Sequence, residues 1–219
     1  PLYNVYNFAT CPIERPVEEG KGMKVSGLLR TPLFWVAIVL MVCAGASELS
    51  MAQWASAYTE SALGLSKAMG DVAGSCLFAV TMGISRVIFG KYGDRLDLMK
   101  CMVGSGCLCL LCYVAASLLE NPILGLIGCV MCGFSVGILW PGTISICSGR
   151  LPGGGTAMFA LLAMAGDLGG AFGPSLVGNI TQAAGNDLRR GMLVGCVFPL
   201  VLVAALLVMK RMRGRERLG

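Results

Sequence analysis

Six long apolar runs, separated by short polar connections, constrain the fold of this chain more than any other feature. Each run is long enough to cross the hydrocarbon core of a bilayer as a helix, which takes about 20 residues. Only 13% of the residues are charged, whereas a soluble domain carries about 25%. The sequence therefore predicts an all-α fold, a polytopic membrane helix bundle with six transmembrane helices. The spans are expected near residues 33–58, 68–90, 100–119, 122–148, 155–184 and 190–210.

Lysine and arginine residues gather on alternate connections between these runs. Most of them precede the first run or follow the second, fourth and sixth runs, and the other side carries Lys67, Arg189 and Arg190. Cytoplasmic loops of membrane proteins carry an excess of such cations. We therefore expect an integral protein of the cell (inner or plasma) membrane, with both ends of this segment in the cytoplasm. The expected parts are a cytoplasmic linker, a six-helix transmembrane part and a basic cytoplasmic tail, at residues 1–31, 32–211 and 212–219.

The absence of histidine and the position of the cysteines exclude several kinds of site. The chain has no His, which removes Ser-His-Asp and Cys-His catalysis and most zinc sites. Nearly all of its 11 cysteines lie inside apolar runs, where a buried cysteine behaves as a small hydrophobic residue. The net charge of +5 does not form the basic stripe with interleaved aromatic residues that indicates nucleic-acid binding. We therefore expect no catalytic residue, no metal, no cofactor and no nucleic-acid partner.

One face of the first span carries polar groups at membrane depth. A carboxylate near the centre of a transmembrane helix costs roughly 2.5–3.5 kcal/mol on insertion scales, so Glu48 should face protein or water. At about 100° per residue, Glu48 shares its face with Met51, Trp54 and Tyr58. We interpret this face as the wall of a substrate cavity, with Glu48 as a polar contact or proton carrier. The alternative is a hydrogen bond between helices that has no functional role.

The fourth and fifth runs contain glycine and proline at positions where lipid contact does not need them. In the fifth run, glycines recur at a spacing that lets two helix backbones approach closely: Gly166, Gly169, Gly170 and Gly173. Pro174 follows them and should break the hydrogen-bond ladder, which allows a hinge. Asp167, beside the glycines, faces either the cavity or a charge partner, unless this region only packs tightly. In the fourth run, Trp140 belongs to a Trp-Pro-Gly kink and either lines the cavity or packs against other side chains.

The loop GKYGDRLDLMK, between the second and third runs, concentrates charge in a chain that has little of it. Its spacing of Gly90, Asp94 and Arg95, with a further cation beyond, resembles the loop signature of the major facilitator superfamily, G-x-x-x-D-R/K-x-G-R-K/R. The loop departs from that signature at Asp97, where Gly is usual, and at Leu98, where Arg is usual. The run GGAFGPSLVG in the fifth span is similar to the G-x-x-x-G-P pattern of the fifth helix in the same family.

Over residues 31–210 these motifs resemble the carboxyl-terminal half of a twelve-helix transporter. The resemblance implies two halves that rock about a central site, each built from two inverted three-helix repeats. Here the repeats would be spans one to three and spans four to six. The implied function is secondary active transport of a small polar solute by alternating access. The implied partners are an amino-terminal six-helix half of the same transporter, membrane lipid, the small-molecule substrate and protons.

The resemblance also gives the charged loop a role in conformational change. It implies that Asp94 accepts hydrogen bonds at a helix amino end and pairs with a cation. Arg150, at the end of the fourth span, is the matching partner, and Arg86 and Arg95 compete with it. Together with Gly90, these residues would form a cytoplasmic latch that holds one conformation and breaks in the other.

Several functions fit this reading. Within the superfamily, Glu48, Trp54 and the Gly-Asp-Leu-Gly-Gly run resemble sugar permeases of the fucose-permease kind, which implies proton-coupled sugar uptake. The same fold also serves drug or metabolite efflux. A six-helix scaffold or receptor without transport would lack a central cavity. A two-carboxylate membrane protease would need Asp71 and Asp167 to meet, and neither has the usual flanking motif, so we do not expect an enzyme.

Overall fold

The computed structural model describes residues 5–6, 9–11, 23–64, 66–119, 121–151 and 153–216. Within those ranges the chain is helical and contains no β-strand. Its named elements are α2 (Val25–Leu29), α3 (Pro32–Leu63), α4 (Lys67–Gly70), η1 (Asp71–Cys76), α5 (Leu77–Tyr92), η2 (Gly93–Arg95), α6 (Leu98–Leu118), α7 (Pro122–Val136), α8 (Leu139–Arg150), α9 (Gly155–Ala183), α10 (Leu188–Gly195) and α11 (Val197–Glu216).

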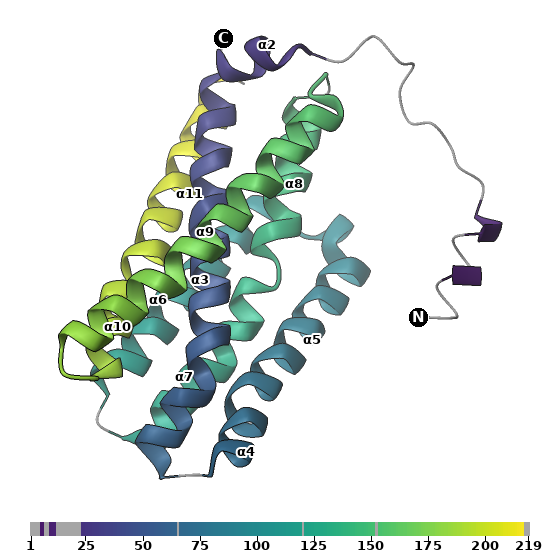
Figure 1. Cartoon of the computed structure of the whole chain (residues 1–219). Helices are drawn as coiled ribbons and strands as arrows, with labels where there is room; N and C mark the ends of the chain where they lie inside the picture. The colour runs from purple at the N-terminus through teal and green to yellow at the C-terminus, as the bar shows by residue number, and fades with distance from the viewer. Residues whose placement is uncertain are drawn as a thin grey trace.

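Six helical units in the described part of the chain are long and apolar enough to cross a membrane. Three of them are the single helices α3, α6 and α9. The other three are composites, namely α4–η1–α5, α7–α8 and α10–α11. The units alternate in direction, so that α2 and the α8–α9 connection lie at one end of the bundle and the α3–α4 and α9–α10 connections at the other (Figure 1). The prediction of an all-α bundle with six transmembrane helices is confirmed.

Helix α3 is the centre of the bundle. It packs most extensively on α9 and also contacts α7, α8, α11 and η1. Most of α3 is buried, including Phe34, Leu40 and Met41, whereas α5 is largely exposed. Small residues along α3, such as Gly45 and Ala46, let neighbouring helices approach it closely.

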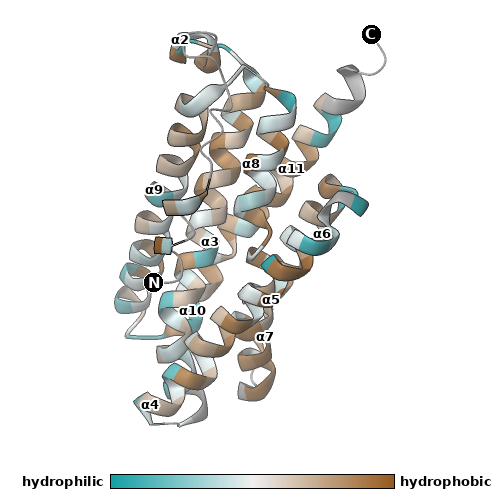
Figure 2. Cartoon of the chain, turned by 90° about the vertical axis from the view of Figure 1, so that its right-hand side faces the viewer, coloured by the Kyte–Doolittle hydropathy of each residue, from teal (hydrophilic) through white to brown (hydrophobic). Residues whose placement is uncertain are grey.

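Short polar side chains determine where several helices begin. Asp97 accepts hydrogen bonds from the backbone N–H groups of Met99 (3.1 Å) and Lys100 (3.3 Å), and so caps the amino end of α6. Asn121 and Asp187 cap α7 and α10 in the same way. Figure 2 shows hydrophilic residues mostly near the helix ends and apolar residues along the helices. The apolar spans are therefore bordered by polar connections, as a bilayer requires.

The two ends of the bundle carry different charged residues. Lys24 and Arg30 flank α2, and Arg150 ends α8 at the same end of the bundle. Lys67 and Arg190 lie at the opposite end, in α4 and α10. Three of the cations that the sequence assigns to the cytoplasm, Lys24, Arg30 and Arg150, thus share one end, and the orientation in the membrane stays a prediction.

The fourth and sixth membrane-crossing units are each interrupted one turn before a proline. α7 and α8 are separated at Gly137 and Ile138, because Pro141 has no N–H to donate to the carbonyl of Gly137. The sequence predicts the kink at the Trp-Pro-Gly run that begins with Trp140, and the structure places the interruption just before it. α10 and α11 are separated in the same way, one turn before Pro199.

The two ends of the chain are described in part. Much of the expected linker, including residues 12–22, lies outside the described residues, and α2 forms within its final part. Met23 donates its N–H to the carbonyl of Gly153 (2.5 Å), which holds the start of α2 against the α8–α9 connection. α11 stays helical to Glu216, and residues 217–219 of the expected tail lie outside the described residues. The division into linker, transmembrane part and tail stays a prediction.

Candidate functional site

A cavity with charged walls lies between α3, α5, α8 and α9. Its volume is about 510 Å³, within the range of about 300–1,000 Å³ that is usual for small-molecule sites. It forms beside α3, where α5 and α9 make almost no contact with each other in the described bundle (Figure 1). We call it the charged cavity, and it is lined by Glu48, Leu49, Arg86, Trp140, Pro141, Ile144 and Asp167.

Glu48 and Arg86 form an ion pair at this cavity. Nη2 of Arg86 lies 3.4 Å from Oε1 of Glu48. The Glu48 side chain is 15% exposed and the Arg86 side chain is 48% exposed, so the carboxylate is the more desolvated partner. Its second oxygen, Oε2, is buried and has no hydrogen-bond partner among the described residues. The cavity therefore holds an acceptor that a hydroxyl or amine of a bound solute can satisfy.

Trp140 and Asp167 complete the polar part of the charged cavity. The Trp140 ring rests on Gly166 of α9, where a Cβ atom would come within 2.5 Å of the ring. Its Nε1 is buried and donates to no acceptor among the residues that the structure describes, so the cavity holds an unused N–H donor. Asp167 is exposed on α9 and lines the same cavity. The sequence singles out Glu48, Trp140 and Asp167, and the structure brings these three together.

Arg86 is the charged residue of the cavity that the sequence did not predict there, and the apolar Leu49 and Ile144 were not predicted there either. The sequence groups it with the cations of the following loop, whereas the structure pairs it with Glu48. One signal could have found it, because Arg86 lies more than a helical turn inside the end of α5 at Tyr92. A charged side chain that far inside an apolar run needs a partner, and Glu48 carries the opposite charge at depth in the first span.

Glycines of α9 allow its close contact with α3 beside the charged cavity. A Cβ atom at Gly169 would overlap the carbonyl of Val42. Gly45 of α3 is the reciprocal position, because a Cβ atom there would overlap the carbonyl of Gly166. The backbones of α3 and α9 are therefore in direct contact. Gly173 also faces the backbone of α3, at Ala46, whereas Gly166 faces the Trp140 ring and Gly170 faces the Leu49 side chain.

Comparison with protein families decides the class of the chain. The sequence matches the model of the Major Facilitator Superfamily over residues 12–174, which is most of the chain. The chain belongs to the Major Facilitator Superfamily. Every residue that lines the charged cavity lies within the matched part. No curated protein and no solved structure matched the sequence.

Membership of this superfamily sets the class of function. The chain is a membrane transporter of the Major Facilitator Superfamily, not an enzyme, and transport implies that it binds a substrate. The described residues do not form the site of a paired-aspartate protease. Asp167 of α9 lines the charged cavity. Asp71 belongs to η1, near the α3–α4 connection, and accepts a hydrogen bond from Ser56 (2.5 Å).

Within this transporter, Trp54 lies at a second hollow, farther along α3 than Glu48. The hollow has a volume of about 460 Å³ between α3 and α9. The indole Nε1 of Trp54 donates to the carbonyl of Pro174 (3.2 Å), and α9 continues as a helix through that proline. Leu49 lines the charged cavity and presses on Gly170, which lines the second hollow. Leu49 thus lies between the charged cavity and the second hollow.

Met51 and Tyr58, which the sequence predicts on the cavity wall, lie instead in the packed interior. Met51 is fully buried, and Tyr58 is 1% exposed. Tyr58 packs against Gly125 of α7, where a Cβ atom would overlap the phenol oxygen. The helical period predicts one polar face for α3, but α7 covers the part of that face that carries Tyr58. The structure corrects the expectation that these two residues line the cavity.

The structure describes the loop that carries the superfamily motif, except for the side chain of Asp94. Asp94 belongs to η2, but its side chain lies outside the described part. The carboxylate that caps α6 is that of Asp97, a role that the sequence assigns to Asp94. Arg150 donates from Nη1 to the carbonyl of Met209 in α11 (3.3 Å), and its Nη2 is buried without a partner in the described structure. The latch stays a prediction for Gly90, Asp94, Arg95 and Arg150.

Cysteines pack where α6 meets α7. Cys109, Cys112, Cys129 and Cys132 are all buried, and the Sγ atoms of Cys109 and Cys132 lie 3.8 Å apart. Within the described ranges, no group of three or more His, Cys, Asp or Glu residues is arranged to hold a metal ion. Their burial makes these cysteines small apolar residues of the helix contact.

Proposed function

We propose that this chain is the carboxyl-terminal six-helix half of a secondary active transporter, and that the charged cavity is its part of the substrate site. The transporter moves a small polar solute by alternating access, and proton-coupled sugar uptake is the specific form that we propose. One observation carries the proposal. An ion pair, a further carboxylate and an indole N–H line one cavity inside an apolar bundle.

Charged groups at membrane depth cost free energy, and such residues therefore usually mark a functional site. Each costs roughly 2.5–3.5 kcal/mol at the centre of a helix on insertion scales. Glu48 offers a buried oxygen that lacks a described partner, Trp140 offers an N–H in the same condition, and Arg86 offers further donors. These donors and acceptors can form hydrogen bonds with the hydroxyl groups of a sugar. The Trp140 ring and Ile144 can pack against its C–H faces.

The position of the cavity suits alternating access. Glu48 and Arg86 come from the first three spans, and Trp140 and Asp167 come from the last three. If these spans form inverted repeats, a solute that contacts Glu48 and Asp167 joins the two repeats. The close glycine contact between α3 and α9, which also crosses from one repeat to the other, provides the surface along which they shift.

Proton coupling follows from the same ion pair. Protonation of Glu48 would remove the charge that holds Arg86, and the guanidinium would then be free to contact the solute or Asp167. The loop residues Asp94 and Arg95, with Arg150, would hold the opposite conformation. Asp94→Ala should therefore reduce transport more than it reduces membrane insertion, and equal losses of both would contradict the latch.

Transport by the full-length protein in proteoliposomes tests the proposal. A panel of labelled hexoses and polyols is screened for uptake with and without an inward proton gradient. Glu48→Gln and Asp167→Asn should each lower uptake at least about tenfold, the effect of losing about 1.4 kcal/mol of binding, while expression and membrane insertion persist. Glu60→Gln, an exposed carboxylate near the end of α3, is the matched control and should transport normally.

Three outcomes would contradict parts of this proposal. If both cavity variants transport like the parent protein, the charged cavity is not the substrate site. If no sugar is transported but other solutes are, the sugar assignment fails and efflux of drugs or metabolites becomes the better assignment. If uptake ignores the proton gradient, Glu48 does not couple protons to transport.

A further inference from the structure

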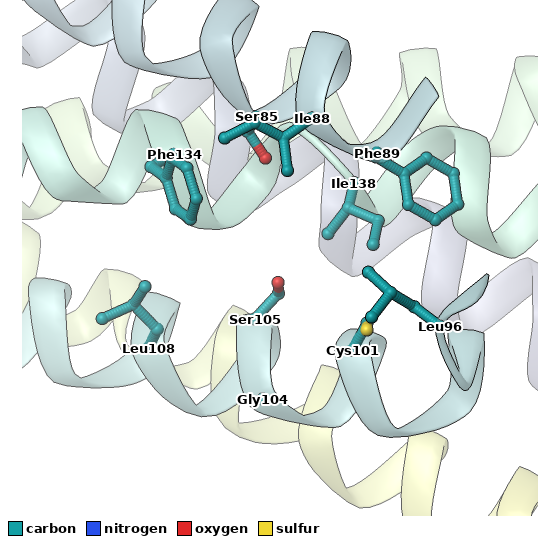
Figure 3. Close-up of a pocket in the computed structure, with 10 residues that line it drawn as sticks. All are labelled: Ser85, Ile88, Phe89, Leu96, Cys101, Gly104, Ser105, Leu108, Phe134 and Ile138. Atoms are coloured by element: carbon teal, nitrogen blue, oxygen red, sulfur yellow. The ribbon is translucent and has the colours of Figure 1, made fainter. Parts of the chain in front are cut away.

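A crevice between α5 and α6 lies apart from the charged cavity. Both helices pack on α7, but they make almost no contact with each other in the described bundle. The crevice has a volume of about 320 Å³, and no residue lines both it and the charged cavity. Its walls are apolar, with Ile88 and Phe89 from α5, Leu108 from α6 and Phe134 from α7 (Figure 3).

The crevice runs inward from the α5–α6 connection. Leu96 lines it at that connection, and Cys101 and Leu108 line it two turns apart along α6. Two turns of helix correspond to about 10 Å, whereas one leaflet of the hydrocarbon core is about 15 Å deep. The crevice therefore lies within a single leaflet, the one on the side of the connection.

The side of the crevice is open. Gly104 of α6 lines it and is exposed, and no described atom lies within 4 Å of the position of a Cβ atom there. The neighbouring surface is apolar, with Val87 of α5 71% exposed and Leu111 of α6 64% exposed. In a membrane, such an opening admits hydrocarbon chains and excludes polar solutes.

The connection at the end of the crevice carries more positive than negative charge. Lys91 and Arg95 are exposed. Lys100 lies 3.8 Å from the Asp97 carboxylate, which also caps α6. With Asp94, whose side chain lies outside the described part, the connection still has one more cation than carboxylates. An anionic headgroup is therefore attracted to this end of the crevice.

Two hydroxyl groups lie inside the otherwise apolar crevice. Figure 3 shows Ser85 of α5 and Ser105 of α6 with their oxygens directed toward the gap between the helices. Ser105 follows Lys100 by more than one turn of α6, which places it about 7 Å deeper. The ester groups of a glycerophospholipid lie at such a depth below its phosphate. The two hydroxyls can donate hydrogen bonds to ester carbonyls there.

We propose that this crevice binds one anionic glycerophospholipid from the leaflet on the side of the α5–α6 connection. The headgroup lies near Lys91 and Arg95, the ester groups lie at Ser85 and Ser105, and one acyl chain lies along the apolar walls toward Phe134. The positive charge of the connection favours this lipid over a zwitterionic one, which carries the same ester groups. This site does not depend on the identity of the transported solute.

Photo-crosslinking in the full-length transporter tests the site. The protein is reconstituted with phosphatidylglycerol that carries a diazirine in one acyl chain, or with phosphatidylcholine that carries the same chain. After irradiation, mass spectrometry locates the label. We expect label on the crevice segments of α5 and α6, at least about fivefold more from phosphatidylglycerol, which corresponds to the roughly 1 kcal/mol of one cation near anionic lipid. Equal labelling by the two lipids would overturn the proposal.

Matched glycine variants separate a specific site from bulk lipid. Gly104→Leu fills the crevice, and Gly83→Leu places the same side chain on α5 at a position that also has no described atom within 4 Å but does not line the crevice. Gly104→Leu should lower crevice labelling, and Gly83→Leu should leave it unchanged. If both or neither reduce labelling, bulk lipid alone explains the contact.

Variants of the two exposed cations test whether charge selects the lipid. Replacing Lys91 and Arg95 together by Gln should remove the preference for phosphatidylglycerol while labelling by phosphatidylcholine persists. Lys91, in the last turn of α5, and Arg95, in η2, are both exposed, so the fold should tolerate the change. If the preference survives, or if the crevice takes no lipid label because the amino-terminal half covers it, the proposal is wrong.

Discussion

Removing both partners of the Glu48–Arg86 pair should destabilise the protein by less than the sum of the two single removals. Arg86→Gln leaves a carboxylate that is 15% exposed without its cation, and its second oxygen already lacks a described partner. Breaking a buried ion pair costs about 3–5 kcal/mol, whereas an exposed pair contributes about 0.2–1 kcal/mol. Because the Arg86 side chain is 48% exposed, the cost should lie between these limits, at about 2 kcal/mol.

The opposite variant should be milder. Glu48→Gln leaves Arg86 with access to water and with Asp167 in the same cavity, so we expect a loss of about 1 kcal/mol. The double variant carries neither charge and should lose less than the sum of the two. Reversible unfolding of the full-length transporter in mixed micelles measures the four free energies of unfolding. Additivity within about 0.5 kcal/mol would show that the two side chains do not interact, and an Arg86→Gln variant as stable as the parent would refute the desolvation reasoning.

Three further substitutions test the packing that supports the cavity, with the same unfolding assay. Gly169→Ala should cost roughly 1–3 kcal/mol because its Cβ atom overlaps a carbonyl of α3, and Gly83→Ala, at a position without described neighbours, should cost little; equal effects would contradict the close contact. Tyr113→Phe should cost about 1 kcal/mol, because the buried hydroxyl donates to the carbonyl of Ser47 (2.8 Å), and an unchanged stability would rule that bond out. Asp97→Ala should cost about 1 kcal/mol by removing the cap of α6, and Asp97→Asn should restore most of the loss if capping is the cause.

The number and kind of the helices could be predicted from the sequence because a membrane imposes a simple rule. A span needs a long apolar run, and polar residues must end it. The family could be predicted from the loop motif and the glycine motif, since both are local strings of residues. The interruption before Pro141 is a local effect too, but it acts on the preceding turn, so the visible Trp-Pro-Gly run does not coincide with the break at Gly137.

The site could be predicted only in part because side chains at a site come from helices far apart in the sequence. Helical period groups Glu48 with Tyr58, yet it does not say which neighbour covers each end of that face. α7 buries Tyr58, whereas the gap beside α5 leaves Glu48 at a cavity. Arg86 could not be predicted at the cavity because it lies near the loop cations in the sequence. Only the structure shows that its side chain pairs with Glu48 of α3.

Access of a water-soluble reagent to Ile144 tests most directly whether the charged cavity lies on a substrate pathway. Ile144 lines the cavity and carries no charge, so Ile144→Cys should disturb it little. The full-length transporter would carry this change with the three exposed cysteines of this chain, Cys11, Cys76 and Cys107, replaced by Ser. Leu111→Cys on the exposed apolar surface of α6 is the control.

A membrane-impermeant maleimide should label Ile144→Cys, transported solute should slow that labelling, and Leu111→Cys should not react. Labelling of Ile144→Cys that depends on the solute is what an alternating cavity predicts. Failure to label it from either side of the membrane, with the parent protein folded and active, would contradict the assignment of the charged cavity as the substrate site.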